Sequence, residues 1–287
     1  SMAQAYAEGG AGSRMTYGVT GVTVRFDDVT ALDDVTLRAE PGQVSAIVGG
    51  DGAGKTTLLR TLVGRLRPDI GQVDAPPETR IGYQPATGGS WRDLTVDENL
   101  AFVGGIYGLR PSEVRRRSDV LLERAGLADA RNRLASRLSG GMRTKLGFCL
   151  AILHAPDLLV LDEPSTGVDP VSRVELWRLL SETAASGTAV LMATTYMEEG
   201  ERSSHVTVLE KGRVLLEGAP DEVVAASPGV VCTTRKPTRA AFSWRHADGF
   251  REWWPAPPTG ANHPVQVDLE DVAIVAVLRS PAAQVQP

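Results

Sequence analysis

A glycine-rich run constrains the fold of this chain more than any other feature. Residues 49–57 have the sequence G-G-D-G-A-G-K-T-T and fit the pattern G-x-x-x-x-G-K-[ST]. An apolar, strand-like run at residues 44–48 precedes it, and apolar residues at helical spacing follow from residue 58 to residue 66. In that context the glycines let backbone N–H groups converge on phosphate oxygens, and the helix adds the positive end of its dipole. We therefore expect a strand, a phosphate-binding loop and a helix, in that order.

The side chains of this loop are predicted to bind a nucleotide and its metal. Lys55 is placed to reach the β- and γ-phosphates, and the hydroxyl of Thr56 to ligate Mg²⁺. Only four of the 30 Lys and Arg residues in the chain are Lys, so a Lys at this position indicates a need for a compact ammonium. A glycine-rich surface turn is the competing interpretation. The predicted nucleotide-binding residues of the loop are Gly49, Gly50, Asp51, Gly52, Ala53, Gly54, Lys55, Thr56 and Thr57.

Composition limits the classes of protein that this chain can belong to. The chain has 287 residues, 42% of them hydrophobic, which suits one large domain with a substantial core. Its net charge of −5 argues against a general nucleic-acid-binding protein. No apolar run approaches the roughly 18 residues of a membrane span, and residues 1–14 lack the apolar centre of a secretion signal. We expect a cytosolic protein without a membrane span of its own, with a disordered tag or leader at residues 1–14.

The order of the predicted elements indicates an α/β domain over residues 15–228. A helical stretch at about residues 86–150 interrupts the α/β core as an inserted subdomain, and its first helix opens with the capping box T-V-D-E at residues 95–98. The basic triplet at residues 115–117 is more simply a solvated helix face than a nucleic-acid patch. Residues 229–287 differ in composition, with three tryptophans and a proline-rich stretch. We expect a small C-terminal accessory region there, with a regulatory or docking role.

Three further motifs follow the phosphate loop in a fixed order. Residues 138–142 have the sequence L-S-G-G-M, in which Ser139 can cap a helix and the glycines allow close approach to an anion. Residues 161–164, L-D-E-P, end a predicted buried strand, where doubly wound sheets bind ligands. Residues 165–170, S-T-G-V-D-P, form a tight turn directly afterwards. Each motif is weak alone, but all four in this order are highly specific.

These motifs resemble those of the ATP-binding-cassette (ABC) ATPase family over about residues 17–225. The Met142 form of the signature and the segment Y-M-E-E at residues 196–199 are similar to ATPase subunits of ABC-2-type exporters, the drug-efflux class. The resemblance implies an α/β fold with a P-loop NTPase (RecA-like) core, an antiparallel β subdomain and the inserted helical subdomain. It also implies ATP and Mg²⁺ as ligands, and a transmembrane permease and a second ABC ATPase subunit as partners. The resemblance further implies a cytoplasmic protein that is held at the inner face of the cell membrane by its contact with the permease.

The resemblance assigns roles to three residues outside the loop but in the same subunit. Phe26 occupies the aromatic position that stacks on adenine. Asp162 orients Mg²⁺, and Glu163 is the general base that acts on the attacking water. The chain thus carries both a metal ligand and a base for phosphoryl transfer, a reaction that depends mainly on positioning and charge stabilisation.

The resemblance also assigns residues that act across a dimer of two such subunits. Ser139, Gly140 and Gly141 form the signature, which contacts the γ-phosphate held by the partner subunit. Asp169 is the acid of the D-loop. Since each site in such a dimer borrows from both chains, an intact signature here would complete the partner's site.

Two positions depart from the family pattern. The Q-loop glutamine of the pattern falls at Ala86, and Gln84 lies two residues too early. The switch histidine falls at Thr195, whose hydroxyl can hydrogen-bond a phosphate but which has no imidazole to orient water. We therefore expect tight ATP binding with slow or partner-dependent hydrolysis, and predict that this chain forms the weak half of an unequal pair.

Two other functions stay open beside the leading hypothesis. Non-transport ABC proteins of translation or DNA repair usually carry two cassettes or a long coiled coil, whereas only 84 positions without heptads separate Lys55 from Ser139. A nucleotide-sensing subunit with little turnover is favoured by Ala86 and Thr195 and opposed by Glu163. The leading hypothesis is the ATP-hydrolysing subunit of an ABC exporter, which powers transport by a separate membrane subunit.

Overall fold

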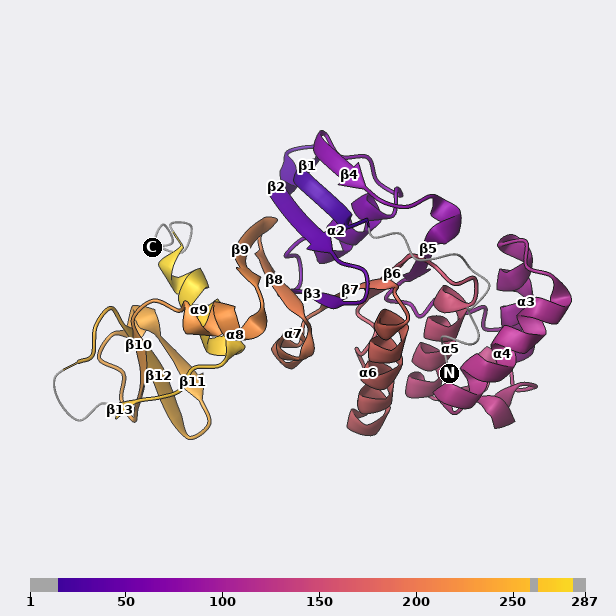
Figure 1. Cartoon of the computed structure of the whole chain (residues 1–287). Helices are drawn as coiled ribbons and strands as arrows, with labels where there is room; N and C mark the ends of the chain where they lie inside the picture. The colour runs from indigo at the N-terminus through magenta and orange to yellow at the C-terminus, as the bar shows by residue number, and fades with distance from the viewer. Residues whose placement is uncertain (1–14, 259–262, 281–287) are drawn as a thin grey trace.

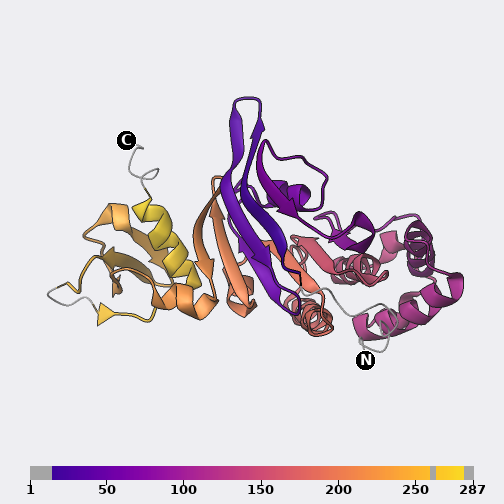
Figure 2. The same ribbon diagram turned by 45° about the horizontal axis from the view of Figure 1, so that its top comes forward.

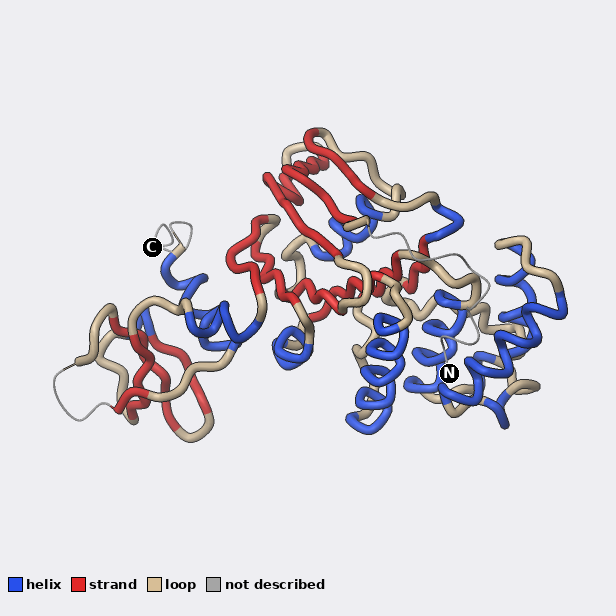
Figure 3. Tube along the Cα trace, in the orientation of Figure 1, coloured by secondary structure: helices blue, strands red, loops and turns tan. Residues whose placement is uncertain are grey.

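The computed structural model describes residues 15–258 and 263–280. Its named strands form three sheets, of three, four and six strands. Figures 1 and 3 show the C-terminal sheet at one end of the molecule and the helices of residues 96–125 at the other, with the six-stranded sheet between them. The prediction for residues 1–14 lies outside the described residues.

The N-terminal sheet is antiparallel, as expected. It has the strand order β2-β1-β4, with β1 at Tyr17–Phe26, β2 at Val29–Ala39 and β4 at Ile70–Asp74. Figure 2 shows β1 and β2 side by side as a long twisted ribbon. Apolar side chains of β1 and β2 form one core cluster with α2 (Lys55–Leu62) and with one face of the six-stranded sheet. This sheet therefore covers the helix that follows the phosphate loop.

The six-stranded sheet has the parallel core that a RecA-like fold requires. Its strands, in spatial order, are β5 (Ile81–Gln84), β6 (Leu158–Asp162), β7 (Ala189–Thr194), β3 (Val44–Val48), β8 (His205–Glu210) and β9 (Arg213–Gly218). The first five run parallel, and β9 pairs antiparallel with β8. Every residue of β3, β6 and β7 is buried, as expected for mainly apolar strands that are covered on both faces of a parallel sheet. Ile47 packs toward α2, whereas Ala46 and Val48 pack toward α6 (Pro170–Ala185) and the helical subdomain.

Three helices form the inserted subdomain between β5 and β6. They are α3 (Val96–Ile106), α4 (Pro111–Ala125) and α5 (Gly140–Ile152). The predicted capping box at Thr95 is present: its hydroxyl accepts from the Glu98 N–H at 3.2 Å, and the Glu98 carboxylate accepts from the Thr95 N–H at 2.7 Å. Pro111 begins α4, and Gly126 ends it in the left-handed conformation. The subdomain thus begins and ends its helices with the signals that the sequence carries.

The expectation of a solvated face at residues 115–117 is confirmed for Arg115 and Arg116, which are exposed, and is wrong for Arg117. Arg117 is only 6% exposed. Its guanidinium donates to the Leu153 carbonyl at 2.8 Å and pairs with Glu113 at 2.5 Å. On a helix of 3.6 residues per turn, three successive residues point about 100° apart, so one of the three faces the core and finds its partners there.

The C-terminal region contains a small sheet and a helix that packs against the main domain. The sheet has the strand order β11-β12-β10-β13, with β10 at Val230–Thr234, β11 at Ser243–His246, β12 at Gly249–Trp254 and β13 at His263–Pro264. It has a small core with Val231 and Trp253. The helix α9 (Leu269–Arg279) contacts α7 (Met197–Arg202), α8 (Pro220–Ala225) and β9, and Leu269 joins the main core cluster. The boundary at residue 229 stays a prediction, since the helix beyond it is packed into the larger core.

Across the described ranges, every helix is too short or too polar to cross a bilayer.

Candidate nucleotide-binding site

The phosphate loop lies at the edge where the parallel strands of the six-stranded sheet end. It connects β3 to α2, and β7 and β8 flank β3 on either side. Glu163 follows β6 and Thr195 follows β7, so both arrive at the same edge as the loop. Ligands of open α/β sheets bind at this edge, outside the carboxyl ends of the strands.

Gly54 shows why the loop requires glycine directly before the helix. Its φ is 105°, in the left-handed region that side chains rarely adopt. A Cβ at this position would lie 2.7 Å from the Ala31 carbonyl oxygen. The loop can therefore turn closely beneath β2 before α2 begins at Lys55, and the buried leucines of α2 then anchor the helix in the core.

The Lys55 ammonium is held at the base of the loop. Its side chain is 7% exposed, and Nζ donates to the carbonyl of Gly49 at 2.7 Å and to that of Gly50 at 3.1 Å. It also pairs with Glu163, with 3.2 Å between Nζ and Oε1. A compact cation is thus fixed between the phosphate loop and the acid at the end of β6.

Thr56 and Asp162 face each other across the same edge. The Thr56 hydroxyl donates to both carboxylate oxygens of Asp162, at 3.0 and 3.2 Å. Burial raises the pKa of Asp162, while the hydrogen bond from Thr56 opposes that shift and the nearby Glu163 charge adds to it. A hydroxyl beside a carboxylate fits Mg²⁺, which takes oxygen ligands and shares them with substrate phosphates. Within residues 15–258 and 263–280, no three His, Cys, Asp or Glu residues gather into a metal site of their own.

Glu163 adopts a backbone conformation that is uncommon for its residue type. Its φ is 51°, in the left-handed region that costs non-glycine residues of order 1–3 kcal/mol and that clusters at functional sites. Its N–H donates to the Ala193 carbonyl at 2.9 Å. One carboxylate oxygen pairs with Lys55, and the other accepts from the Thr166 hydroxyl at 2.9 Å. The carboxylate is therefore oriented from two sides.

Lys55, Thr56 and Glu163 line one pocket of about 880 Å³, whereas Gly49 and Asp162 lie outside its lining. Its lining contains Gly50, Asp51, Gly52, Ala53, Gly54, Lys55, Thr56, Thr57, Glu163 and Thr195, all predicted from the sequence. It also contains Val29, Thr30, Ala31, Ala86, Thr166 and Lys211, which were not assigned to the nucleotide. The first three of these belong to the start of β2, which begins three residues after Phe26. This proximity in the sequence to the predicted adenine-stacking residue is the signal that could have identified them.

Phe26 lies outside this pocket lining. It ends β1, pairs with Val29 and is 47% exposed. Its role as the adenine-stacking residue stays a prediction, supported by the position of Val29 in the lining.

The structure places the two unusual positions beside the loop. Ala86 and Thr195 both line the pocket, whereas Gln84 is 2% exposed and its Nε2 donates to the Thr144 carbonyl of α5 at 3.2 Å. Gln84 therefore points into the helical subdomain and does not replace a glutamine at position 86. His205 does not replace a switch histidine either, because it begins β8 at the opposite edge of the sheet and contacts Glu217 at 3.3 Å.

The signature residues and the D-loop acid lie outside the pocket of their own chain. Ser139 caps α5, and its hydroxyl accepts from the Met142 N–H at 3.3 Å. Gly140 and Gly141 follow as the first residues of that helix. Asp169 caps α6 by accepting from the Val171 and Ser172 N–H groups, which lowers the pKa of its carboxyl. Both segments are thus ordered at helix N-termini, away from the Lys55 pocket.

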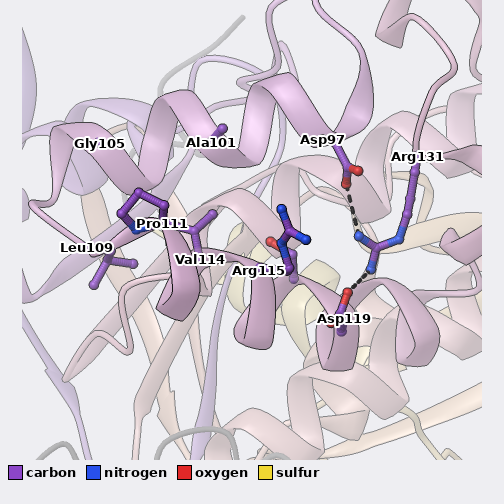
Figure 4. Close-up of a pocket in the computed structure, with 10 residues that line it drawn as sticks. Asp97, Ala101, Gly105, Leu109, Pro111, Val114, Arg115, Asp119 and Arg131 are labelled. Carbon is purple, nitrogen blue, oxygen red and sulfur yellow. Dashed lines mark hydrogen bonds and ion pairs between the residues drawn. The ribbon is translucent and has the colours of Figure 1, made fainter.

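A second hollow, of about 710 Å³, lies between α3 and α4 in the helical subdomain (Figure 4). Arg131 connects its two sides, with ion pairs to Asp97 at 3.3 Å and to Asp119 at 2.5 Å. Pro111 and Leu109 lie at its other end. These paired charges bind one another, and the residues predicted to bind phosphate line the first pocket instead.

Comparison with known proteins identifies the class to which this fold and site belong. The model of the ABC transporter family matches residues 32–166. The chain is 36% identical over 222 residues to a daunorubicin resistance ATP-binding protein, DrrA3, of Streptomyces coeruleorubidus, covering 74% of this chain and 70% of the relative. It is 36% identical over 231 residues to the Nod factor export ATP-binding protein I of Ralstonia nicotianae, covering 77% and 72%. A probable multidrug ABC transporter ATP-binding protein of Escherichia coli, YbhF, is 38% identical over 223 residues, covering 74% of this chain and 39% of that protein.

Solved structures agree with these relatives. An ATP-binding subunit of an ABC transporter superposes with a TM-score of 0.66 at 26% identity, covering 74% of this chain and 92% of that one. CbiO1 from Clostridium perfringens, part of an ABC transporter complex, gives a TM-score of 0.65 at 28% identity, covering 73% and 90%. The chain belongs to the ABC transporter family as an ATP-binding subunit. Its relatives are named as ATP-binding proteins of drug resistance, Nod factor export and multidrug transport, and they favour an ATPase subunit of an exporter over a non-transport ABC protein.

Proposed function

We propose that this subunit binds MgATP in the Lys55 pocket and hydrolyses it slowly to drive export by a separate transmembrane permease. The observation that carries the proposal is the position of the Lys55 ammonium, 3.2 Å from the Glu163 carboxylate and at the loop that leads into Thr56. Lys55, Glu163 and Thr56 line one pocket, and the Thr56 hydroxyl is hydrogen-bonded to Asp162. Phosphoryl transfer needs these groups in position and little covalent chemistry from the protein.

Each group has a separate role in the proposed reaction. The loop N–H groups and Lys55 bind the phosphates. Thr56 and Asp162 would hold Mg²⁺, which supplies positive charge at the phosphates when bound. Glu163, oriented by Thr166, accepts the proton of the attacking water as its oxygen bonds to the γ-phosphorus. The bond to the bridging oxygen breaks, and ADP and phosphate are released.

Slow turnover follows from the side chains at positions 86 and 195. A family glutamine and histidine would each place a hydrogen-bonding group beside the attacking water and the γ-phosphate. Ala86 has no such group, and the side chain of Thr195 carries its hydroxyl less far from the backbone than a histidine carries its imidazole. The binding groups are intact, so we expect affinity for ATP to be retained while the rate of the chemical step is low.

ABC ATP-binding subunits dimerise and work with membrane permeases. We propose that this subunit is the weaker half of an unequal pair on the cytoplasmic side of the membrane. The arrangement in this chain supports the idea, because Ser139 and Asp169 lie outside their own Lys55 pocket and are free to serve the site of a partner subunit. An intact signature beside a weakened pocket is most useful to a partner that has the full set of groups.

Replacement of the pocket lysine tests the proposal. Lys55→Ala should abolish detectable MgATP binding in titration calorimetry, because the variant removes the phosphate-binding ammonium. Lys236→Ala, an exposed lysine of the C-terminal region, is the matched control and should bind as the wild type does. Equal affinity of the wild type and Lys55→Ala would contradict the assignment of this pocket.

A further inference from the structure

The turn between β8 and β9 lies on the flank of the phosphate loop opposite the proposed chemistry. In the order β5-β6-β7-β3-β8-β9, the strands that lead to Glu163 and Thr195 lie on one side of β3, and β8 lies on the other. Figure 1 shows the β8–β9 hairpin next to β2. Lys211 stands in this turn and lines the same pocket as the phosphate loop.

Hydrogen bonds from two directions fix this turn. The Gly212 N–H donates to the Ala53 carbonyl of the phosphate loop at 2.9 Å. The Gly212 carbonyl accepts from the Asp33 N–H of β2 at 2.8 Å, and Arg213 pairs with the Asp33 carboxylate. Lys211 has a φ of 48°, in the left-handed region. Its backbone is thus held between the middle of the loop and the start of β2.

The charge of Lys211 is available to a ligand. Among the residues that the structure describes, Lys211 forms no ion pair, whereas the neighbouring Arg213 is engaged by Asp33. Its side chain is exposed at the pocket. Only four lysines occur in the chain, and two of them, Lys55 and Lys211, line this one pocket. A lysine at such a position acts as a compact point charge for phosphate.

Building on the proposed function, we propose that Lys211 is a second nucleotide-contacting cation, directed at the α-phosphate end of the nucleotide. The Glu163–Thr195 flank serves the γ-phosphate, and Lys211 stands across the loop from it, beside Val29, Thr30 and Ala31. ATP and ADP share the α-phosphate, so Lys211 strengthens the binding of both. We therefore expect Lys211 to contribute to the affinity for either nucleotide.

The test compares MgATP and ADP binding to Lys211→Asn and Lys211→Arg by titration calorimetry. Asn tolerates the left-handed backbone, so the first variant removes the charge without straining the turn, and the second retains the charge. We expect Lys211→Asn to raise both Kd values about five- to tenfold at low salt, with a smaller ratio at 1 M salt, where charges are screened within about 3 Å. Lys211→Arg should restore most of the affinity for both nucleotides.

The outcomes distinguish the role of Lys211 from the proposed binding of ATP in the Lys55 pocket. Wild-type protein that fails to bind ATP would contradict the proposed function itself. Wild-type binding with an unchanged Kd in Lys211→Asn would overturn the role of Lys211 alone. Weaker ATP binding with unchanged ADP binding would overturn its placement at the α-phosphate. Lys236→Asn serves as the matched control, and circular dichroism melting of each variant checks that it is folded.

Discussion

At the scale of single residues, the chain combines an intact phosphate loop with two positions that lack the groups of the family pattern. The loop from Gly49 to Thr57 and the acids Asp162 and Glu163 were predictable because sequence spacing alone places them at the end of a strand. The lining residue Lys211 was not predictable. It reaches the pocket only because β8 neighbours β3 in the sheet, and strand order is not encoded in any local pattern.

His154 provides a residue-scale prediction about pH. Its ring stacks on Tyr107, its Nε2 lies 3.1 Å from the Ile81 carbonyl, and burial lowers its pKa to about 4. The unfolded chain, with a histidine pKa near 6.5, therefore binds more protons than the folded chain between pH 6.5 and pH 4. Stability then falls with falling pH, by about 2 kcal/mol between pH 7 and pH 5 for this group.

Urea unfolding at both pH values measures this contribution. The variant His154→Gln removes the titrating group, so its loss of stability between pH 7 and pH 5 should be smaller than that of the wild type by about the same 2 kcal/mol. His246→Gln, in an exposed part of β11, is the control. An identical pH dependence in wild type and His154→Gln would contradict the buried, neutral histidine.

At the scale of elements, the contact between α9 and α7 connects the C-terminal region to the pocket edge. Leu269 is fully buried against Gly200, where a Cβ would lie 2.9 Å from the Leu269 side chain. The Leu269 N–H donates to Glu201 at 3.1 Å. Two residues earlier, the buried Glu199 accepts from the Thr194 hydroxyl at 2.5 Å, directly before Thr195. The helix α7 is thus held by α9 on one side and positions the pocket segment on the other.

Removal of the Leu269 side chain should therefore destabilise the fold. Leu269→Ala is expected to cost about 2–5 kcal/mol in the free energy of unfolding, since it leaves a cavity beside Gly200. Leu278→Ala, on the same helix but only partly buried, should cost less. Denaturant unfolding of both variants measures the difference. A Leu269→Ala variant as stable as the wild type would show that α9 does not pack as described.

Elements could be predicted where their sequence signals are local. The capping box at Thr95 and the cap at Ser139 were predictable from the sequence because a helix start depends on four neighbouring residues. The burial of Arg117 and the docking of α9 were not, because both depend on partners distant in sequence. Leu153 lies 36 residues from Arg117, and Glu201 lies 68 residues from Leu269.

At the scale of the whole molecule, the C-terminal region is bound into the domain that carries the pocket. A deletion from residue 229 would remove α9 and expose the surface of α7 that it covers. Such a deletion would therefore disturb the main core, which contains Leu269. The fold class was predictable from the order of motifs, whereas this connection was not. Ser139 lies outside the Lys55 pocket of its own chain, so we expect the signature to act only in a dimer of two subunits.

We propose that this pocket binds ATP but turns it over slowly because Ala86 and Thr195 lack the groups that the family pattern has there. The most direct measurement is the steady-state ATPase activity of the isolated wild type and of the double variant Ala86→Gln with Thr195→His. Each of these two proteins is also measured with Glu163→Gln added, as a control. We predict low activity in the wild type and a clear rise in the double variant. Glu163→Gln should abolish both activities, since a general base contributes about 10²–10⁴-fold. Brisk wild-type turnover that survives Glu163→Gln, or a rate unchanged by restoring both side chains, would contradict the account.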